Sequence, residues 1–298
     1  MDGEFDITLV CVPYQMDVAR WGYALGPQAF LDAGLVEALR ARGHHVREPQ
    51  VIELPREERT RDIVTNLGRI AARTSAAVAA GLRRENGFAI VLEGDCTHAV
   101  GAIGGLARVA GPAGVVWFDA HGDLHTMATT GSGYVGGMPY ATALGWDLDD
   151  WRLAAGLDTA VRAEAAALVG DSDLDPEELD ALQRHPILRL PATAMDAPDA
   201  VTRLHDELCE RATEAAAWYL HIDIDVAGPV EAPGGMTPAP HWPTRDRLIA
   251  SVAAASAAVP TRVIGVATYN PAGDPERRAA RFGLDMLLAA LDGATGNE

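Results

Sequence analysis

Two short segments of this chain carry side chains that could bind divalent metal ions. Asp119, His121 and Asp123 follow one apolar run, and Asp223 and Asp225 close another. Because successive side chains of an extended chain alternate between faces, each set is expected to share one face where a strand meets its loop. Four carboxylates and one imidazole suit Mn²⁺, Mg²⁺ or Fe²⁺ better than a thiolate zinc site would. This donor set predicts a centre that activates water as a metal-bound hydroxide.

The apolar runs before these residues predict how the two sets come together. Residues 114–118 and 218–222 have the composition of buried parallel strands. In open parallel α/β sheets ligands bind at the carboxyl ends of strands, so distant segments can converge on one crevice. A lone Asp in such a place is commonly a helix N-cap or a turn residue, and a lone buried His a satisfied core side chain. Four carboxylates together would repel one another or take up protons, however, and a cation removes that problem.

The rest of the chain alternates between apolar runs and helical patterns. We expect strands at residues 6–12, 45–46, 51–52, 87–92, 114–118, 166–169, 187–190, 219–224 and 263–267. We expect helices at residues 29–42, 59–85, 99–109, 176–184, 198–217, 244–258 and 275–291. This alternation implies an α/β fold, a parallel sheet with helices on both faces. The chain of 298 residues is expected to form one domain, residues 1–298, around one large core.

Both metal-ligand segments resemble the paired metal motifs of the arginase/agmatinase ureohydrolase superfamily. The matching stretches are Asp119-Ala-His-Gly-Asp123 and His221-Ile-Asp-Ile-Asp225. Other stretches resemble the family's elements in its order, at residues 26–30, 93–101, 129–133, 237–238 and 269–271. The resemblance covers nearly the whole chain. It implies an arginase-like three-layer α/β/α fold with a mainly parallel sheet of about eight strands.

The resemblance also implies a binuclear manganese centre, with two Mn²⁺ ions per chain. Carried over to this sequence, the ligands would be Cys96, Asp119, His121, Asp123, Asp223 and Asp225. Asp119 and Asp223 would bridge the ions. A hydroxide between them would add to the sp² carbon of a C–N bond and an amine would leave. Asp123 is the candidate catalytic residue that passes a proton to the leaving nitrogen.

Three departures from the family pattern bear on the chemistry. Cys96 stands where the family usually has a metal-binding His; a thiolate can still bind a metal, or Cys96 is a buried apolar residue beside an empty site. Gly136 stands where members that cleave arginine carry a His. Thr268 replaces the carboxylate that usually holds the guanidinium, and Thr cannot form a bidentate ion pair. Arginine and agmatine are therefore poor candidate substrates.

The Cys ligand and the loop around Gly136 most resemble one branch, the Nω-hydroxyarginine amidinohydrolases of cycloserine-type antibiotic biosynthesis. This resemblance implies an amidinohydrolase of secondary metabolism that acts on a hydroxyguanidine or another modified guanidine or amidine. Thr268 departs from that branch as well, which leaves the exact substrate open. Two alternatives stay open. One is a mononuclear, deacetylase-like amidohydrolase, and the other is a catalytically degenerate binding protein with the same fold.

By position, a further set of residues is expected to contact the substrate. These residues are His125, Thr130, Ser132, Tyr134, Thr237 and Thr268. The first four would line the entrance, Thr237 would lie nearer the metals, and Thr268 would lie at the base of the pocket. The alternative for the stretch rich in Thr, Gly and Ser is an ordinary loop without a contact role.

The composition limits the classes of partner. A formal net charge of −18 argues against nucleic acid, because phosphates require a basic patch. The chain has no run of about 18 apolar residues, and its acidic start differs from a signal peptide, so neither a membrane partner nor export is expected. Three scattered cysteines fit a reducing cytoplasm. We expect a cytoplasmic enzyme with a small-molecule substrate; the family often forms trimers or hexamers, which leaves a homo-oligomer open.

Overall fold

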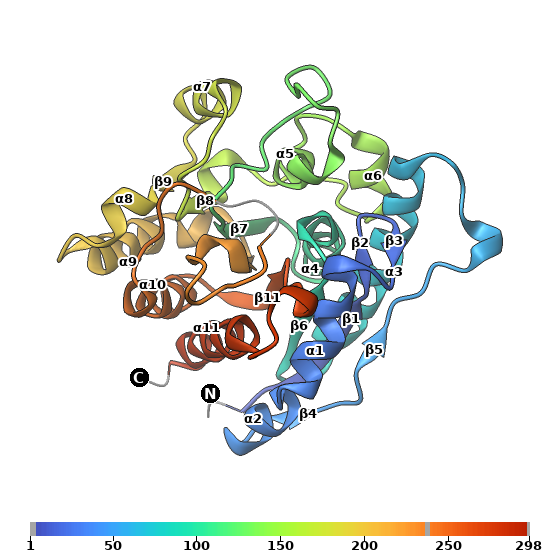
Figure 1. The fold of residues 1–298 in the computed structure, drawn as a ribbon, viewed down its shortest axis with the longest axis horizontal. Coiled ribbons are helices and arrows are strands. Elements are labelled where there is room, and N and C mark those ends of the chain that lie inside the picture. Colours follow the sequence, from blue (N-terminus) through green and yellow to red (C-terminus); the bar gives the residue numbers. More distant parts are fainter. Residues whose placement is uncertain (1–3, 236–238, 297–298) are drawn as a thin grey trace.

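The computed structural model describes residues 4–235 and 239–296. Its main feature is a nine-stranded sheet in the order β4-β1-β6-β11-β10-β7-β8-β9, with β5 also beside β1. All of these strand pairs are parallel, and helices lie on both faces (Figure 1). The strands are β1 Asp6–Val12, β4 His45–Val46, β5 Gln50–Val51, β6 Gly87–Glu93, β7 Ala113–Phe118, β8 Ala166–Val169, β9 Leu188–Leu190, β10 Ala217–Asp223 and β11 Thr261–Ala267. The expected three-layer α/β/α fold is confirmed.

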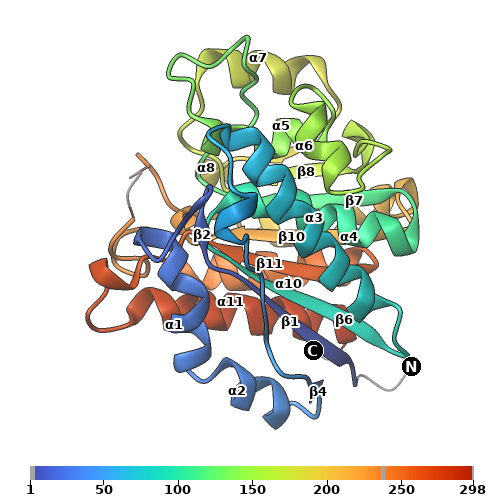
Figure 2. The same cartoon turned by 90° about the vertical axis from the view of Figure 1, so that its right-hand side faces the viewer.

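Apolar side chains on both faces of the central strands account for the layers. In β7, Val115 and Trp117 belong to one buried cluster and Val116 and Phe118 to the other, because strand side chains alternate. The first cluster packs under α3 and α4, and the second under α1, α2 and α9–α11. Figure 2 shows α3 and α4 on the opposite side of the sheet from α11. The helices are α1 Gly26–Asp32, α2 Leu35–Ala41, α3 Ile63–Leu82, α4 Ala99–Ala110, α5 Pro139–Ala143, α6 Asp149–Ala154, α7 Pro176–Arg184, α8 Ala192–Met195, α9 Ala200–Arg211, α10 Arg245–Ala258 and α11 Arg278–Thr295.

Several elements differ from the sequence-based expectation. The helix expected over 29–42 is two helices, because Gly34 between them has φ 92°, a left-handed conformation that breaks the helical path. The helix expected over 198–217 ends at Arg211 and continues only as the 3₁₀ turn Ala212–Glu214. The sequence pattern also does not predict the small antiparallel pair β2 Tyr14–Gln15 and β3 Val18–Ala19. Among the described residues, no helix combines the length and apolarity needed to cross a membrane.

Strand order explains how the candidate residues meet. The four central strands β6, β11, β10 and β7 are neighbours, so their carboxyl ends form one edge of the sheet. Cys96 follows β6, Thr268 follows β11, Asp223 ends β10 and Asp119 follows β7. Residues separated by more than a hundred positions in the chain therefore lie together at this edge, as expected for ligand sites of parallel sheets.

Candidate metal centre

At the two strand ends the backbone turns, whereas the alternating pattern of ligands predicts an extended chain. Strand β7 ends at Phe118, so Asp119 and the residues after it form a loop in which Asp123 has φ 51°. Asp225 lies in the 3₁₀ turn Ile224–Val226, where its backbone N–H donates to Asp223 Oδ1 at 2.7 Å. The extended geometry expected for both segments is therefore wrong. The turns nevertheless direct both segments toward one point.

Two groups of side chains lie close enough to hold a cation. In each group, one candidate ligand atom per residue lies within 4.8 Å of the others. The first group is Cys96, Asp119, His221 and Asp223, and the second is Asp119, His121 and Asp225. Asp119 belongs to both, so the two candidate sites are adjacent. Five of the six ligands expected from the sequence occur in these groups, and His221 is an addition.

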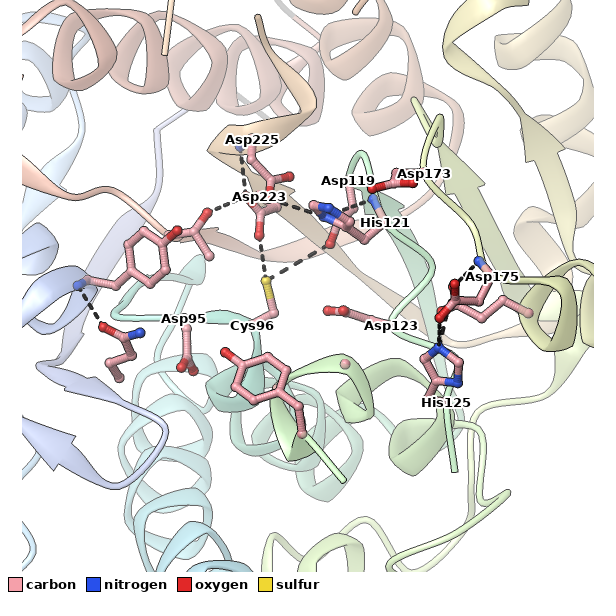
Figure 3. Close-up of a pocket in the computed structure, with 17 residues that line it drawn as sticks. Asp95, Cys96, Asp119, His121, Asp123, His125, Asp173, Asp175, Asp223 and Asp225 are labelled. Carbon is pink, nitrogen blue, oxygen red and sulfur yellow. Dashed lines mark hydrogen bonds and ion pairs between the residues drawn. The ribbon is translucent and has the colours of Figure 1, made fainter. Parts of the chain in front are cut away.

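Hydrogen bonds fix the carboxylates of the first group (Figure 3). The Cys96 thiol donates to Asp223 Oδ2 at 2.8 Å and lies 4.0 Å from Asp119 Oδ2. Trp117 Nε1 donates to Asp119 Oδ2 at 3.0 Å. The hydroxyl of Thr268 donates to Asp223 Oδ1, so that this side chain supports a candidate ligand. Such supporting bonds orient metal ligands and tune their affinity.

His121 joins the two acidic segments. Its Nδ1 lies 3.3 Å from Asp119 Oδ1 and 3.2 Å from Asp225 Oδ2. Burial lowers the pKa of His121, but the two carboxylates outweigh burial and raise it above the ordinary value. Without a cation, the protonated imidazole partly compensates the charge of these carboxylates.

The other buried groups of the centre hold their protons unusually strongly. Burial, reinforced by the Asp223 carboxylate, raises the pKa of Asp119 and of the Cys96 thiol. Burial and the neighbouring Asp119 raise the pKa of Asp123, whose Oδ2 finds no hydrogen-bond partner in the described part of the chain. Buried polar atoms normally have a partner, and mutual repulsion of buried carboxylates is what a cation relieves. The donor set therefore fits divalent metal ions.

A cavity of about 440 Å³ opens onto the centre. All six expected ligands line it, and the other lining residues are Gln15, Tyr23, Asp95, His125, Tyr134, Gly136, Gly137, Asp173, Asp175, Glu178 and Thr268. In Figure 3 the carboxyl group of Asp123 points toward the Cys96 side of this cavity. Asp95 lies in the stretch 93–101, where the resemblance assigns a role to Cys96 alone, and Asp173, Asp175 and Glu178 lie in an acidic stretch without a metal or substrate motif.

The residues expected to contact the substrate have different placements. His125, Tyr134 and Thr268 line the cavity, with His125 Nε2 bonded to Asp175 Oδ2 at 2.9 Å. Thr130 and Ser132 are not among the lining residues; the Thr130 hydroxyl accepts from Gly133 N at 3.0 Å. Thr237 lies outside the described residues. A substrate contact for each of these residues stays a prediction.

Behind the centre lies a group of three buried, hydrogen-bonded side chains that the sequence does not predict. They are Glu93, Tyr219 and His221, each at most 1% exposed and joined by hydrogen bonds. One signal was available: His221 stands two residues before Asp223, so that both share a face of the strand. Glu93 lies on β6, with β11 between it and β10, and its contact requires knowledge of the strand order.

Comparisons with known proteins agree with this geometry. The model of the family described as "Arginase family" matches residues 5–292. The chain is 30% identical to N(omega)-hydroxy-L-arginine amidinohydrolase of Streptomyces lavendulae, covering 87% of this chain and 88% of that protein. It is 29% identical to arginase of Bacillus subtilis (strain 168), covering 78% and 79%. A solved structure of arginase from Bacillus caldovelox superposes with a TM-score of 0.86 at 25% identity, covering 99% of both chains.

Proposed function

The chain belongs to the arginase family, and from this premise we propose that it is a metal-dependent hydrolase of a non-peptide C–N bond. The proposed substrate class is a hydroxyguanidine or another modified guanidine or amidine. One observation carries the proposal: two ligand groups, one buried and one partly buried, share Asp119, which lines a cavity large enough for a small molecule. We further propose that this small-molecule chemistry takes place in the cytoplasm as part of secondary metabolism.

The proposed cofactor is a pair of Mn²⁺ ions. Asp119 and Asp223 would bind both ions. Cys96 and Asp123 would complete the ligands of one ion, and His121 and Asp225 those of the other. When bound, such a pair lowers the pKa of a shared water and stabilises negative charge that develops on the substrate.

Asp123 is proposed to move the proton. Its Oδ2 is buried and has no hydrogen-bond partner among residues 4–235 and 239–296, and its carboxyl group points toward the Cys96 side of the cavity in Figure 3. Burial also raises the pKa of this carboxyl group, which favours a form that can carry a proton. A carboxyl group placed beside the reacting atoms can deliver that proton to the leaving nitrogen.

The cavity lining favours a substrate less basic than a guanidine. Thr268 lines the cavity, and its hydroxyl donates to Asp223. It offers neither a negative charge nor the paired oxygens that bind a guanidinium in bidentate fashion. A hydroxyguanidine is less basic and needs no such ion pair. The name of the Streptomyces lavendulae relative agrees with this substrate class.

The test is turnover by the purified, Mn²⁺-loaded protein. Hydroxyguanidines, guanidines, formimino compounds and N-acetyl amides should be offered at equal concentration, with release of the amine and of the carbon fragment measured. We expect hydroxyguanidines to be cleaved faster than the matching guanidines, and Asp119→Asn to abolish this activity. Cleavage of amides alone would favour the mononuclear, deacetylase-like alternative. Turnover of none of these compounds would favour a binding protein and contradict the proposal.

A further inference from the structure

Behind the metal-facing residues lies a buried chain of hydrogen bonds that ends on an imidazole. The Tyr219 hydroxyl lies 2.9 Å from Glu93 Oε1 and 2.8 Å from His221 Nδ1. Glu93 Oε2 lies 3.4 Å from the same ring nitrogen. The His221 ring also stacks on Trp117, with 3.8 Å between ring centroids. These contacts fix both the position and the rotation of the His221 ring.

The order of donors along this chain identifies the free nitrogen of His221. The Tyr219 hydroxyl has one proton, which it donates to the Glu93 carboxylate. Its oxygen must then accept from His221, so that Nδ1 carries the ring proton. Nε2 is then unprotonated, and its lone pair is available to bind a cation. It has no hydrogen-bond partner in the part of the chain that the structure describes.

The surroundings of His221 fit a His that binds a cation better than a His that only packs in the core. A ring nitrogen of His221, the Cys96 sulfur and one oxygen each from Asp119 and Asp223 lie within 4.8 Å of one another. Ligands bound at about 2.0–2.3 Å lie no further apart than roughly 4.6 Å across one ion. Metal-binding His residues also typically donate their other N–H to an anchoring group. Tyr219, backed by Glu93, provides that anchor here.

We propose that His221 binds one metal ion of the pair through Nε2, together with Cys96, Asp119 and Asp223. This assignment deepens the proposed function, on whose binuclear centre it rests. It makes the two sites chemically unequal. The first site has a sulfur and an imidazole, so it accepts Zn²⁺ in place of Mn²⁺ more readily than the site of Asp119, His121 and Asp225, which is richer in oxygen.

The direct test is zinc X-ray absorption on the full-length protein loaded with one equivalent of Zn²⁺. We expect one sulfur and one imidazole in the shell of the same ion. This combination is diagnostic, because Cys96 and His121 do not share a candidate site. A shell with sulfur but no imidazole, or one with imidazole but no sulfur, would overturn the assignment. The measurement needs only the wild-type protein and does not depend on whether a variant folds.

Matched variants identify the imidazole. His221→Asn keeps a side-chain donor at the place of Nδ1, so the bond to Tyr219 can form, but it removes the group at the place of Nε2. We expect it to lose the imidazole signal and to bind Zn²⁺ at least about 100-fold more weakly. His121→Asn should keep the signal. His98→Asn is the control for a buried His nearby, because His98 Nε2 is engaged with Tyr14 O at 2.8 Å.

The outcomes separate this inference from the proposed function. A Zn²⁺ shell with sulfur and imidazole, but no turnover of any C–N compound with Zn²⁺, Mn²⁺ or both, would leave the His221 assignment standing and the function wrong. If the wild type turns over a C–N compound but His221→Asn binds Zn²⁺ as tightly as the wild type, the proposed function stands and the His221 assignment is wrong. His221 would then be a packing residue.

Discussion

Thr268 supports a candidate metal ligand through its hydroxyl. It follows β11 with φ 62°, a conformation that is uncommon for a β-branched residue. Its backbone N–H donates to Gly94 O at 3.0 Å, and its hydroxyl donates to Asp223. One hydrogen bond from the backbone and one from the side chain thus hold Thr268 in this conformation, and the hydroxyl faces a candidate ligand.

A pair of substitutions at Thr268 tests this role. Thr268→Val keeps the shape but removes the hydroxyl, so Asp223 loses an orienting donor. We predict that Mn²⁺ binds about 10–100-fold more weakly to this variant, the range typical for partners of metal ligands. Thr268→Ser keeps the hydroxyl and should bind Mn²⁺ like the wild type. Titration followed by electron paramagnetic resonance of free Mn²⁺ measures both; equal affinity in the two variants would refute the role.

Asp123 is the residue whose substitution should separate chemistry from metal binding. Asparagine has nearly the same shape, but its amide cannot carry a proton to the leaving nitrogen. We predict that Asp123→Asn lowers kcat by about 10²–10⁴-fold, the usual contribution of a positioned acid or base. Most of the metal should stay bound, as measured by elemental analysis. A variant with the wild-type rate would show that the proton-relay role is wrong.

At the scale of elements, Glu178 links helix α7 to the loop that carries the ligands. One of its oxygens accepts from Leu124 N at 3.1 Å and the other from Asp175 N at 3.0 Å, the second as part of the helix capping box. The same carboxylate packs against Gly122, where an added Cβ would lie 2.5 Å from Oε1. A side chain at position 122 would therefore have to displace this carboxylate from its two hydrogen bonds.

Substitution of Glu178 should loosen this junction. In Glu178→Gln one oxygen becomes an NH₂ group that faces a backbone N–H, whichever way the amide turns. We predict a loss of about 1–3 kcal/mol in the free energy of unfolding, the cost of an unsatisfied buried donor. Glu177→Gln, an exposed neighbour on the same helix, should change stability by less than about 0.5 kcal/mol. Urea unfolding of the two variants compares them, and similar stabilities would contradict the link.

The elements that the sequence predicts well are those with a strong local pattern. The strands 6–12 and 166–169 and the helix 176–184 occur with the expected bounds, because apolar runs and the Pro176 helix start are local signals. The break at Gly34 was missed because the apolar pattern continues across it. The short helices α5 and α6 were missed because they depend on packing against α3 and α4 rather than on their own pattern.

The candidate site, too, was predictable only where its residues follow a local sequence pattern. Asp119, His121, Asp223 and Asp225 follow strong strand signals, so their convergence could be inferred from the rule for parallel sheets. The role proposed for His221 could not be inferred in this way, because a His within an apolar strand is ordinarily a core residue. Its surroundings come from β6, β11 and β7, and which strands neighbour β10 is not written in any local pattern.

At the scale of the whole molecule, the buried carboxylates should make stability depend on pH and metal. Burial raises the pKa of Asp119, Asp123 and Asp223 above the ordinary 3.8. In the metal-free protein the native state therefore retains protons that the unfolded chain releases. Proton retention stabilises the native state. This contribution to stability is fully present below the pKa values of these carboxyl groups in the unfolded chain, and it is lost as the pH rises through their pKa values in the folded protein.

We predict that the metal-free protein unfolds at a lower temperature at about pH 8 than at about pH 5, and that added Mn²⁺ reverses the trend. Metal at about 1,000 times its Kd should add about 4 kcal/mol. Calorimetry with and without chelator measures both effects. Asp223→Asn, which removes one of these carboxyls, should flatten the pH dependence; a metal-free protein whose stability rises over this range would contradict the prediction.

The most direct measurement for the binuclear centre is the metal content per chain. Wild type and Cys96→Ala should be purified with added Mn²⁺ and without chelator, then analysed by plasma mass spectrometry. We predict about two ions per wild-type chain and about one in Cys96→Ala, because the thiol belongs to only one of the two ligand groups. One ion in both proteins would indicate a mononuclear site, and none in the wild type would contradict a metal-dependent hydrolase altogether.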